Sequence, residues 1–263
     1  MTATIAPPPQ IAGGRRALSG LVPAAAVLVW IPLVLGLDSL VGLGGQRLLG
    51  ALTWVLLIGL LRRESPRTRA QVVVVVVFAT LVEYCFAGWL GVYSYRLGNV
   101  PAFVPPGHGL VYLAALCIGR STLARAVSRP AMIATVIGGG LWALWGLTLS
   151  PRPDALGAFW YACLLGFLIF GRQQRLVYVG AFLVVSLLEI IGTALGTWAW
   201  APVDPIVGWI SMGNPPSGAA GGYGWFDAAG IALAPAVVRL ASRYCRAWRV
   251  PIWHRRSPGT DPG

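Results

Sequence analysis

The sequence contains no lysine and little charge of any kind. Only 11% of its 263 residues are charged, and all twenty basic residues are arginine. A soluble domain usually carries about a quarter charged residues, so this chain lacks the charge needed to cover a water-exposed surface. Instead, 57% of the residues are hydrophobic and the mean hydropathy is +0.72. This composition excludes a water-soluble globule and predicts an all-α, polytopic membrane protein.

Cysteine and histidine are also scarce. The four cysteines stand singly, without a C-x-x-C pair, and the two histidines, His108 and His254, are far apart in the sequence. A catalytic zinc site normally needs three protein ligands, often several of them histidine, so a zinc enzyme is not expected. The sequence shows no nucleotide or haem motif either. We therefore predict no cofactor and no bound metal.

The formal net charge of +12 does not form a single basic stripe. The arginines occur in short groups between apolar segments, a pattern typical of membrane orientation rather than of nucleic-acid binding. We expect a lipid bilayer as the surroundings, a hydrophobic small molecule as the ligand and no nucleic acid as a partner. The sequence leaves the oligomeric state open.

Eight apolar segments are candidates for membrane crossing. A helix needs about 20 mostly apolar residues to cross a hydrocarbon core about 30 Å thick. The candidates lie at about residues 21–43, 47–61, 71–90, 109–126, 131–149, 155–170, 176–195 and 223–240. The second, fourth and eighth are short or interrupted. The sequence thus predicts a bundle of about eight transmembrane helices, preceded by an N-terminal tail at residues 1–20.

The arginines provide an independent test of this count, because cytoplasmic loops are enriched in arginine. All but three of the twenty arginines fall in the tails or in alternate connections between the candidate helices. The other connections hold only Arg47, Arg96 and Arg152. A missed or extra helix would break this alternation. The pattern predicts an even number of crossings of the plasma membrane, with both termini cytoplasmic.

Two segments of the chain resemble each other. Residues 81–112 and 187–223 each contain Leu-x-Glu, then Leu-Gly, an aromatic-x-aromatic pair, a Pro-containing stretch and Pro-Pro. We interpret the chain as two four-helix halves of the same orientation, at residues 21–129 and 130–241, followed by a basic cytoplasmic tail at residues 242–263. Parallel repeats of this kind are related by an axis along the membrane normal.

The loops after the two aromatic pairs fall on the same, non-cytoplasmic side of this arrangement. Each contains Pro-Pro, which cannot lie inside a regular helix. Non-helical backbone at membrane depth survives only where it is buried in protein or lines a water-filled cavity. Two interpretations remain open: the loops dip into the bilayer and close a pocket between the halves, or they are surface connectors with interfacial aromatic residues.

Glu83 and Glu189 are the first candidates for chemistry. An ionisable group inside a membrane helix costs at least a few kcal/mol and is by default a functional-site hypothesis. At 1.5 Å per residue, each glutamate lies roughly 10 Å inside the outer boundary. Equal depth on equivalent helices predicts that both face one central cavity. The alternative is a structural carboxylate that pairs with an arginine, such as Arg96 or Arg120, with His108, or with neighbouring helices.

His108 and Asp227 complete the predicted catalytic set. They lie near the starts of the last expected helices of the two halves, at loosely equivalent positions. His108 is a candidate general acid or base, with a satisfied interfacial histidine as the alternative. Asp227 either shares the catalytic role or caps its helix and stabilises the helix dipole.

Aromatic residues gather around the two loops. An aromatic face attracts positive charge, so these side chains are suited to a pocket that shields a carbocation or holds a flat, unsaturated substrate. An aromatic belt at the membrane surface is the alternative. The predicted substrate-binding residues are Trp89, Tyr93, Tyr95, Arg96, Asn99, Trp198, Trp200, Asn214, Tyr223 and Trp225.

Both motif segments resemble an integral-membrane carotenoid-biosynthesis family that includes carotenoid hydratases. In that family a glutamate is followed by spaced glycines, an aromatic-x-aromatic pair and a Pro-containing segment. The residues that carry the resemblance are Glu83, Gly91, Tyr93 and Tyr95 in the first segment and Glu189, Gly192, Thr193, Gly196, Trp198 and Trp200 in the second. The second segment departs from the family in having Trp where the first has Tyr. A fainter similarity is to small multi-pass membrane terpene cyclases, which also use acidic residues in helices.

Three functions remain open. The first, which both resemblances imply, is a membrane hydratase, cyclase or isomerase that acts on a lipidic alkene or isoprenoid. One glutamate would protonate a double bond, and the other, with His108 or Asp227, would take a proton from water or from the cation. The second is a transporter or proton-coupled carrier that uses the two glutamates as a relay. The third is a structural or assembly protein whose loops bind a partner.

Overall fold

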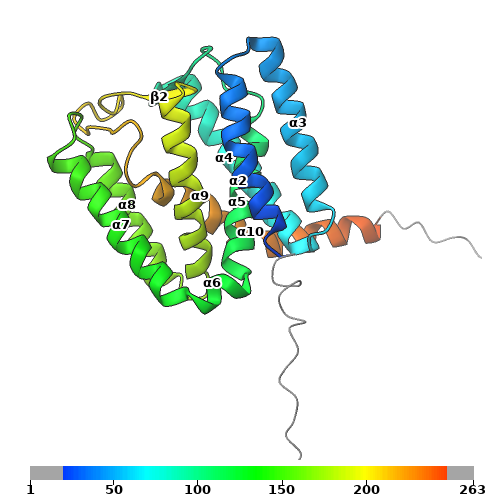
Figure 1. The fold of residues 1–263 in the computed structure, drawn as a ribbon. Coiled ribbons are helices and arrows are strands. Elements are labelled where there is room, and N and C mark those ends of the chain that lie inside the picture. Colours follow the sequence, from blue (N-terminus) through cyan, green and yellow to red (C-terminus); the bar gives the residue numbers. More distant parts are fainter. Residues whose placement is uncertain (1–19, 248–263) are drawn as a thin grey trace, which may run out of the picture.

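The computed structural model describes residues 20–247, and about three quarters of this range is helical (Figure 1). The expected tail at residues 1–20 and most of the tail at 242–263 lie outside the described residues. The helices are α2 Val22–Asp38, α3 Leu43–Leu61, α4 Pro66–Glu83, α5 Val104–Arg120, α6 Thr122–Ala126, α7 Ser128–Thr148, α8 Ala155–Phe170, α9 Arg175–Ala194 and α10 Ala219–Ala247. A π-helical segment, η1 Tyr84–Leu90, extends α4, and two short strands are β1 Tyr93–Tyr95 and β2 Trp198–Trp200.

The described residues include five helices that are long and apolar enough to cross a membrane. They are α3, α4 continued by η1, α7, α9 and α10, whereas α2 and α8 are shorter apolar helices. The helical part of the prediction is thereby confirmed, and the five apolar helices agree with a multi-pass membrane protein. Each of the eight expected segments falls mainly on one helix, but eight crossings, and the side on which the termini lie, stay predictions.

Four helices begin four or five residues earlier than expected, among them α3 at Leu43 and α4 at Pro66. Helix α5 starts at Val104, because prolines occupy its first turn, where their missing N–H groups have no partner in the helix in any case. Pro105 and Pro106 therefore open the helix instead of forming part of a loop before it. Helix α10 starts at Ala219 rather than near residue 223. Helix α5 also ends earlier than expected, at Arg120, where Ser121 adopts an extended conformation and caps the short helix α6.

The two aromatic-x-aromatic segments pair with each other as a small antiparallel sheet. Ser94 lies opposite Ala199, with Tyr93 opposite Trp200 and Tyr95 opposite Trp198. The aromatic residues alternate with small ones, which is the period-two pattern of a strand with one buried face. The purely α-helical prediction missed this pairing, because contact between segments so far apart in the chain leaves no local signal.

The π-helical segment compensates for a difference of one residue in length between the two motif segments. Tyr93 follows Glu83 by ten residues, whereas Trp198 follows Glu189 by only nine. A π-helical segment accommodates an additional residue within a helix, and η1 lies only in the first, longer segment. Both segments then turn at a glycine with positive φ, 70° at Gly91 and 69° at Gly196. The aromatic pairs consequently meet in register.

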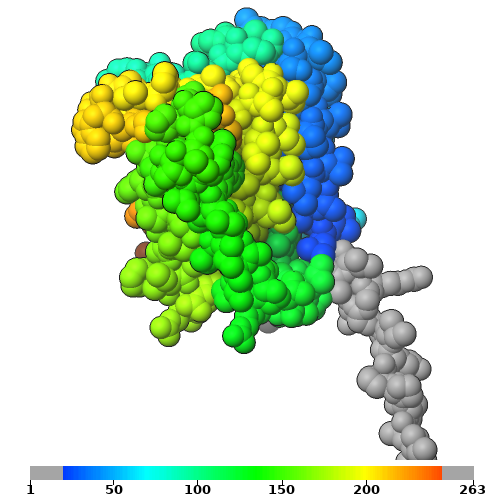
Figure 2. Space-filling view, turned by 60° about the vertical axis from the view of Figure 1, so that its left-hand side comes forward, coloured from blue at the N-terminus to red at the C-terminus, as the bar shows by residue number. Residues whose placement is uncertain are grey.

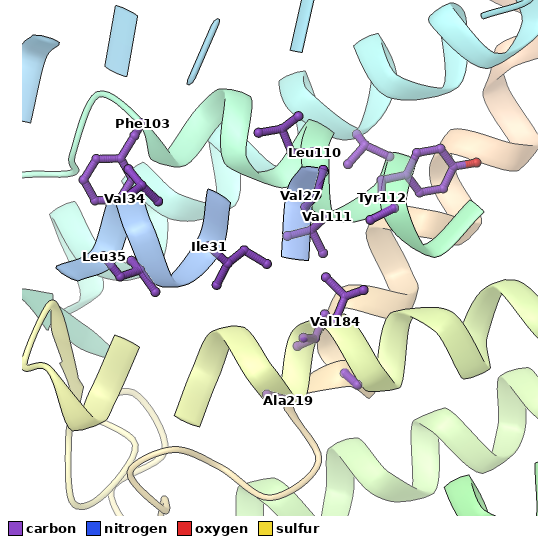
Figure 3. Packing of buried hydrophobic residues seen from close by; sticks show 14 of the residues in the cluster. Val27, Ile31, Val34, Leu35, Phe103, Leu110, Val111, Tyr112, Val184 and Ala219 are labelled. Atoms are coloured by element: carbon purple, nitrogen blue, oxygen red, sulfur yellow. The ribbon is translucent and has the colours of Figure 1, made fainter. Parts of the chain in front are cut away.

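Helix α5 is the central helix of the bundle. It packs against α9, α4, α2 and α3, and side chains of α2, α5 and α9 fill the space between them, as Figure 3 shows for Val27, Leu110 and Val184. Helices α5 and α9 approach closely at Gly180, where a Cβ would stand 2.8 Å from the carbonyl oxygen of Ala115.

The bundle has two chemically different ends. We call the end that carries β1 and β2 the strand end, and the opposite end, with α6 and the arginine-rich connections at residues 62–69, 120–129 and 172–175, the basic end (Figure 1). The segment between β2 and α10 projects from the strand end, visible in gold in Figure 2. It carries exposed Ile206 and Trp209.

Candidate functional site

A cavity of about 360 Å³ lies next to the two strands, inside the bundle. Side chains of α2, α4, α5, α8, α9 and α10 line it, and most of them are apolar or aromatic. Its acidic lining residues are Glu83, Glu189 and Asp204, and none of the described arginines lines it. Oδ1 of Asp204 accepts hydrogen bonds from the N–H groups of Ile206 and Val207.

Glu83, the last residue of α4, accepts three hydrogen bonds. The hydroxyls of Tyr93 and Tyr95 donate to its Oε2 at 2.9 and 2.7 Å, and Nε2 of His108 lies 2.8 Å from its Oε1. The carboxylate is 5% exposed. Its own motif segment thus supplies two of the donors, through the strand that follows the helix, and α5 supplies the third.

Glu189 on α9 is held in a parallel way. The indole Nε1–H groups of Trp198 and Trp200 donate to its Oε2 at 3.0 and 3.1 Å. No hydrogen bond from a described residue reaches its Oε1. In each motif segment, therefore, the aromatic pair of the strand donates hydrogen bonds to the glutamate of the preceding helix. The two glutamates differ in that one oxygen of Glu189 is left available to a ligand.

Neither glutamate is paired with an arginine in the described part of the chain. The guanidinium of Arg96 lies 3.6 Å from Asp38 and that of Arg120 pairs with Glu64. The arginine-paired interpretation of the two glutamates is therefore wrong, and only His108 of the partners considered for Glu83 reaches it.

His108 lies between Glu83 and an aromatic wall. Its ring stacks on Tyr223 with 5.2 Å between centroids and meets Phe226 edge-on at 5.4 Å. His108 is 5% exposed, and its Nδ1 has no hydrogen-bond partner among the described residues. The histidine is thus fixed by packing and by one bond to Glu83.

The phenols that support Glu83 remain protonated over a wide pH range. Burial, followed by the negative charge of Glu83, raises the pKa of Tyr93 and of Tyr95 well above that of an ordinary tyrosine. Both residues lie in β1, outside the candidate membrane spans. Each hydroxyl therefore stays a donor to the carboxylate at physiological pH.

Asp227 does not line the cavity, although the sequence predicted that it shares the catalytic role with His108. Because α10 begins at Ala219, Asp227 lies two turns into the helix and is not its cap. It follows Tyr223 by four residues, so it lies on the same helix face one turn farther from the strand end. The residue is 4% exposed, and its Oδ2 has no partner in the described structure.

The other predicted binding residues divide into two groups. Tyr93, Tyr95, Trp198, Trp200, Tyr223 and Trp225 line the cavity, whereas Trp89, Arg96, Asn99 and Asn214 do not. The side chain of Trp89 is 83% exposed. The other three hold loops: Arg96 donates to the carbonyl of Val41, Asn99 to Gln46 Oε1, and Asn214 Oδ1 accepts the N–H of Trp200.

Two residues that the sequence interpretation missed fix the second strand and the loop after it. Asp154 accepts the N–H groups of Gly157, Gly213 and Ser217, so one buried carboxylate both caps α8 and fastens the Pro-Pro loop. Arg152 donates to the carbonyls of Trp200 and Met212. The position of Asp154 just before an apolar helix was a readable cap signal, but its contacts with the distant loop were not.

No family model, curated protein or solved structure matches this chain. The fold and the site alone therefore define its class: a helical membrane protein with two buried carboxylates in one aromatic cavity.

Proposed function

We propose that this chain is an integral-membrane enzyme that protonates a carbon–carbon double bond of an apolar, isoprenoid-like substrate. The observation that carries the proposal is the convergence of Glu83, Glu189 and His108 on one apolar cavity. Two titratable groups in different surroundings are the arrangement by which enzymes separate an acid from a base. The resemblance of both motif segments to carotenoid-biosynthesis proteins agrees with this chemistry.

Glu189 takes the role of the acid in this proposal. Its Oε2 is held by two indoles, while Oε1 has no bond from the described residues and is available to a double bond. The Glu83–His108 pair takes the role of the base. Glu83 accepts three hydrogen bonds, as a carboxylate does, and orients His108. The pair receives the proton from water in a hydration, or from the cation in an isomerisation or cyclisation.

Aromatic faces stabilise the cationic intermediate. Trp198, Trp200 and Tyr223 line the cavity between the two carboxylates, and an aromatic face near a desolvated cation contributes about 2 kcal/mol. Such a wall protects a carbocation from water and from premature capture.

The lining also indicates the substrate class. With acidic lining residues and no described arginine, the cavity disfavours a diphosphate or carboxylate headgroup. Its 360 Å³ holds about a dozen water-sized groups, at roughly 30 Å³ each. A long isoprenoid would therefore place one end in the cavity and leave the rest outside. Phe78 and Trp225 line the cavity and are 37% and 52% exposed on candidate membrane spans, which supports sideways entry from the bilayer.

The proposal includes the finer topology that the sequence predicts. An antiparallel strand pair centred on Ser94 and Ala199 has a local two-fold axis, and the Glu–aromatic bonds on its two sides are alike. These features support two parallel repeats related by an axis along the membrane normal. We place eight helices in the plasma membrane, with the basic end cytoplasmic.

A carrier for lipophilic cations is the second candidate. The same observation favours it, since carboxylates and aromatic faces without arginine also suit a bound organic cation. A carrier needs access from both faces, however, and no described residue of the arginine-rich connections lines the cavity.

The deciding experiment compares lipids from cells that make long-chain isoprenoids and express the wild type, Glu83→Gln or Glu189→Gln. Mass spectrometry of the extracts is expected to show a new product with the wild type and its loss with either substitution. Glu64→Gln is the matched control, because this glutamate pairs with Arg120 outside the cavity, and it should keep the product.

Identical lipid profiles from correctly inserted proteins would contradict the proposal that the chain is an enzyme acting on isoprenoids. In that case, glutamate-dependent resistance to lipophilic cations would support the carrier. If neither the lipid profile nor the resistance to lipophilic cations changes when the two glutamates are substituted, a structural or assembly role would explain the protein instead.

A further inference from the structure

A second set of buried polar groups lies one helical turn from the cavity. Tyr112 on α5 is 1% exposed and Asp227 on α10 is 4% exposed, and neither lines the cavity. The hydroxyl of Tyr112 and Oδ2 of Asp227 have no hydrogen-bond partner among the described residues. Leaving such a group buried and unbonded costs about 1–3 kcal/mol. Packing alone therefore does not account for these two residues.

Helix geometry places the two groups opposite each other. Tyr112 follows His108 by four residues on α5, and Asp227 follows Tyr223 by four residues on α10. Residues four apart lie on one helix face, about 6 Å apart along the axis. Since the rings of His108 and Tyr223 stack, the next turn brings Tyr112 towards Asp227. Figure 3 shows the Tyr112 hydroxyl directed towards α10.

The polar groups continue from there to the basic end. Tyr178, in the first turn of α9, stacks on Phe167 with 5.0 Å between ring centroids, and Phe167 in turn lies against Gly224 of α10. We call the series His108, Tyr223, Tyr112, Asp227 and Tyr178 the α5–α10 column. It runs from the cavity towards the arginine-rich connections.

We propose that the α5–α10 column carries protons between the cavity and the basic end, with Asp227 as the intermediate carrier. This inference rests on the proposed function. An acid that protonates a substrate has to be protonated again after each turnover, and the base has to lose the proton that it accepted. Ionisable groups in membrane interiors that face other polar groups commonly form such relays. Asp227 is then a proton-transfer residue, and not the direct base that the sequence suggested.

Each step moves one proton along a hydrogen bond. Water at the basic end, beside Tyr178, gives a proton to the Asp227 carboxylate. The resulting acid passes it through a bridging water, which the unbonded Tyr112 hydroxyl helps to hold. The acceptor is the free Nδ1 of His108, or the Tyr223 hydroxyl, which passes its own proton through water in the cavity to the Glu189 carboxylate. The reverse sequence discharges a proton from the cavity, so no bond to carbon changes in the column.

The test measures proton exchange directly, without turnover. The full chain in lipid nanodiscs is transferred from H2O to D2O while infrared spectroscopy follows the C=O band of its protonated carboxyl groups, and the band lost in Glu189→Gln is assigned to Glu189. Tyr112→Phe and Asp227→Asn should slow the deuterium shift of this band by about tenfold or more, the effect of roughly 1.4 kcal/mol on a barrier. Tyr112→Phe removes only one unbonded hydroxyl, so it keeps the test valid if Asp227→Asn fails to fold.

Tyr161→Phe is the control, because this hydroxyl donates to the carbonyl of Val136 away from the column. It should exchange like the wild type. Equal exchange rates in the wild type, Tyr112→Phe and Asp227→Asn would overturn the path and leave the proposed enzyme standing. Absence of any band that depends on Glu189 would instead contradict the proposal that Glu189 is the acid. Without that acid, no proton path to the cavity is needed.

Discussion

Removal of the Tyr95 hydroxyl tests how the first glutamate is held. Tyr95 donates to Glu83 at 2.7 Å, and Tyr93 donates to the same oxygen at 2.9 Å. A hydrogen bond to a charged group contributes about 1.5–3 kcal/mol. Tyr95→Phe should therefore lower the free energy of unfolding by about this amount. At about 2–4 °C per kcal/mol, the expected fall in the thermal midpoint in detergent is roughly 3–12 °C.

A double-mutant cycle separates this bond from general packing. Tyr95→Phe, Glu83→Gln and the double variant are unfolded under identical conditions, with Tyr84→Phe as the control because the side chain of Tyr84 is 57% exposed. The coupling energy between Tyr95 and Glu83 should be about 1.5 kcal/mol or more. Effects that add within about 0.5 kcal/mol would refute the claim that the strand supports the glutamate.

Further predictions concern the second glutamate, the loop anchor and pH. Gly192→Ala should abolish product formation while leaving membrane insertion intact, because its Cβ would meet the ring of Trp198; activity that survives in lipid extracts would contradict this. Asp154→Ala leaves three backbone N–H groups without an acceptor and should cost about 3 kcal/mol or more, whereas an unchanged thermal midpoint would show that the loop is held by other contacts. The pKa of Tyr93 and Tyr95 is raised on folding, so their contribution to stability is complete below pH 10 and falls only at higher pH. Thermal midpoints measured from pH 8 to 11 should show this alkaline fall in the wild type and a smaller one in the double Tyr→Phe variant.

The helical bundle was predictable because its signals are local. Apolar runs and arginine groups recur along the chain, and each expected segment coincides with a helix to within a few residues. The misplaced boundaries have clear causes. Pro105 and Pro106 indicated a break in the helix, but proline also suits the first turn of a helix, and this ambiguity placed the start of α5 too late.

The arrangement of the site was predictable only in part. The two motif segments pointed to Glu83 and Glu189, since carboxylates in apolar helices are costly wherever they occur. The bonds from each strand to its glutamate depend on one residue of π-helix and on pairing between distant strands. Neither feature has a period or composition of its own in the sequence. Asp227 was misplaced for a different reason: α10 begins one turn earlier than expected, so Asp227 lies within the helix, one turn beyond the cavity residue Tyr223, and not at the helix start.

The central claim is that Glu189 delivers a proton to carbon, and labelled water tests it most directly. The wild type and Glu189→Gln, in nanodiscs that contain isoprenoids from the producing cells, are incubated in D2O, and the products are analysed by mass spectrometry after washing in H2O. The account predicts one carbon-bound deuterium in the wild-type product and no product with Glu189→Gln. A product without carbon-bound deuterium, or one that Glu189→Gln still forms at the wild-type rate, would contradict it.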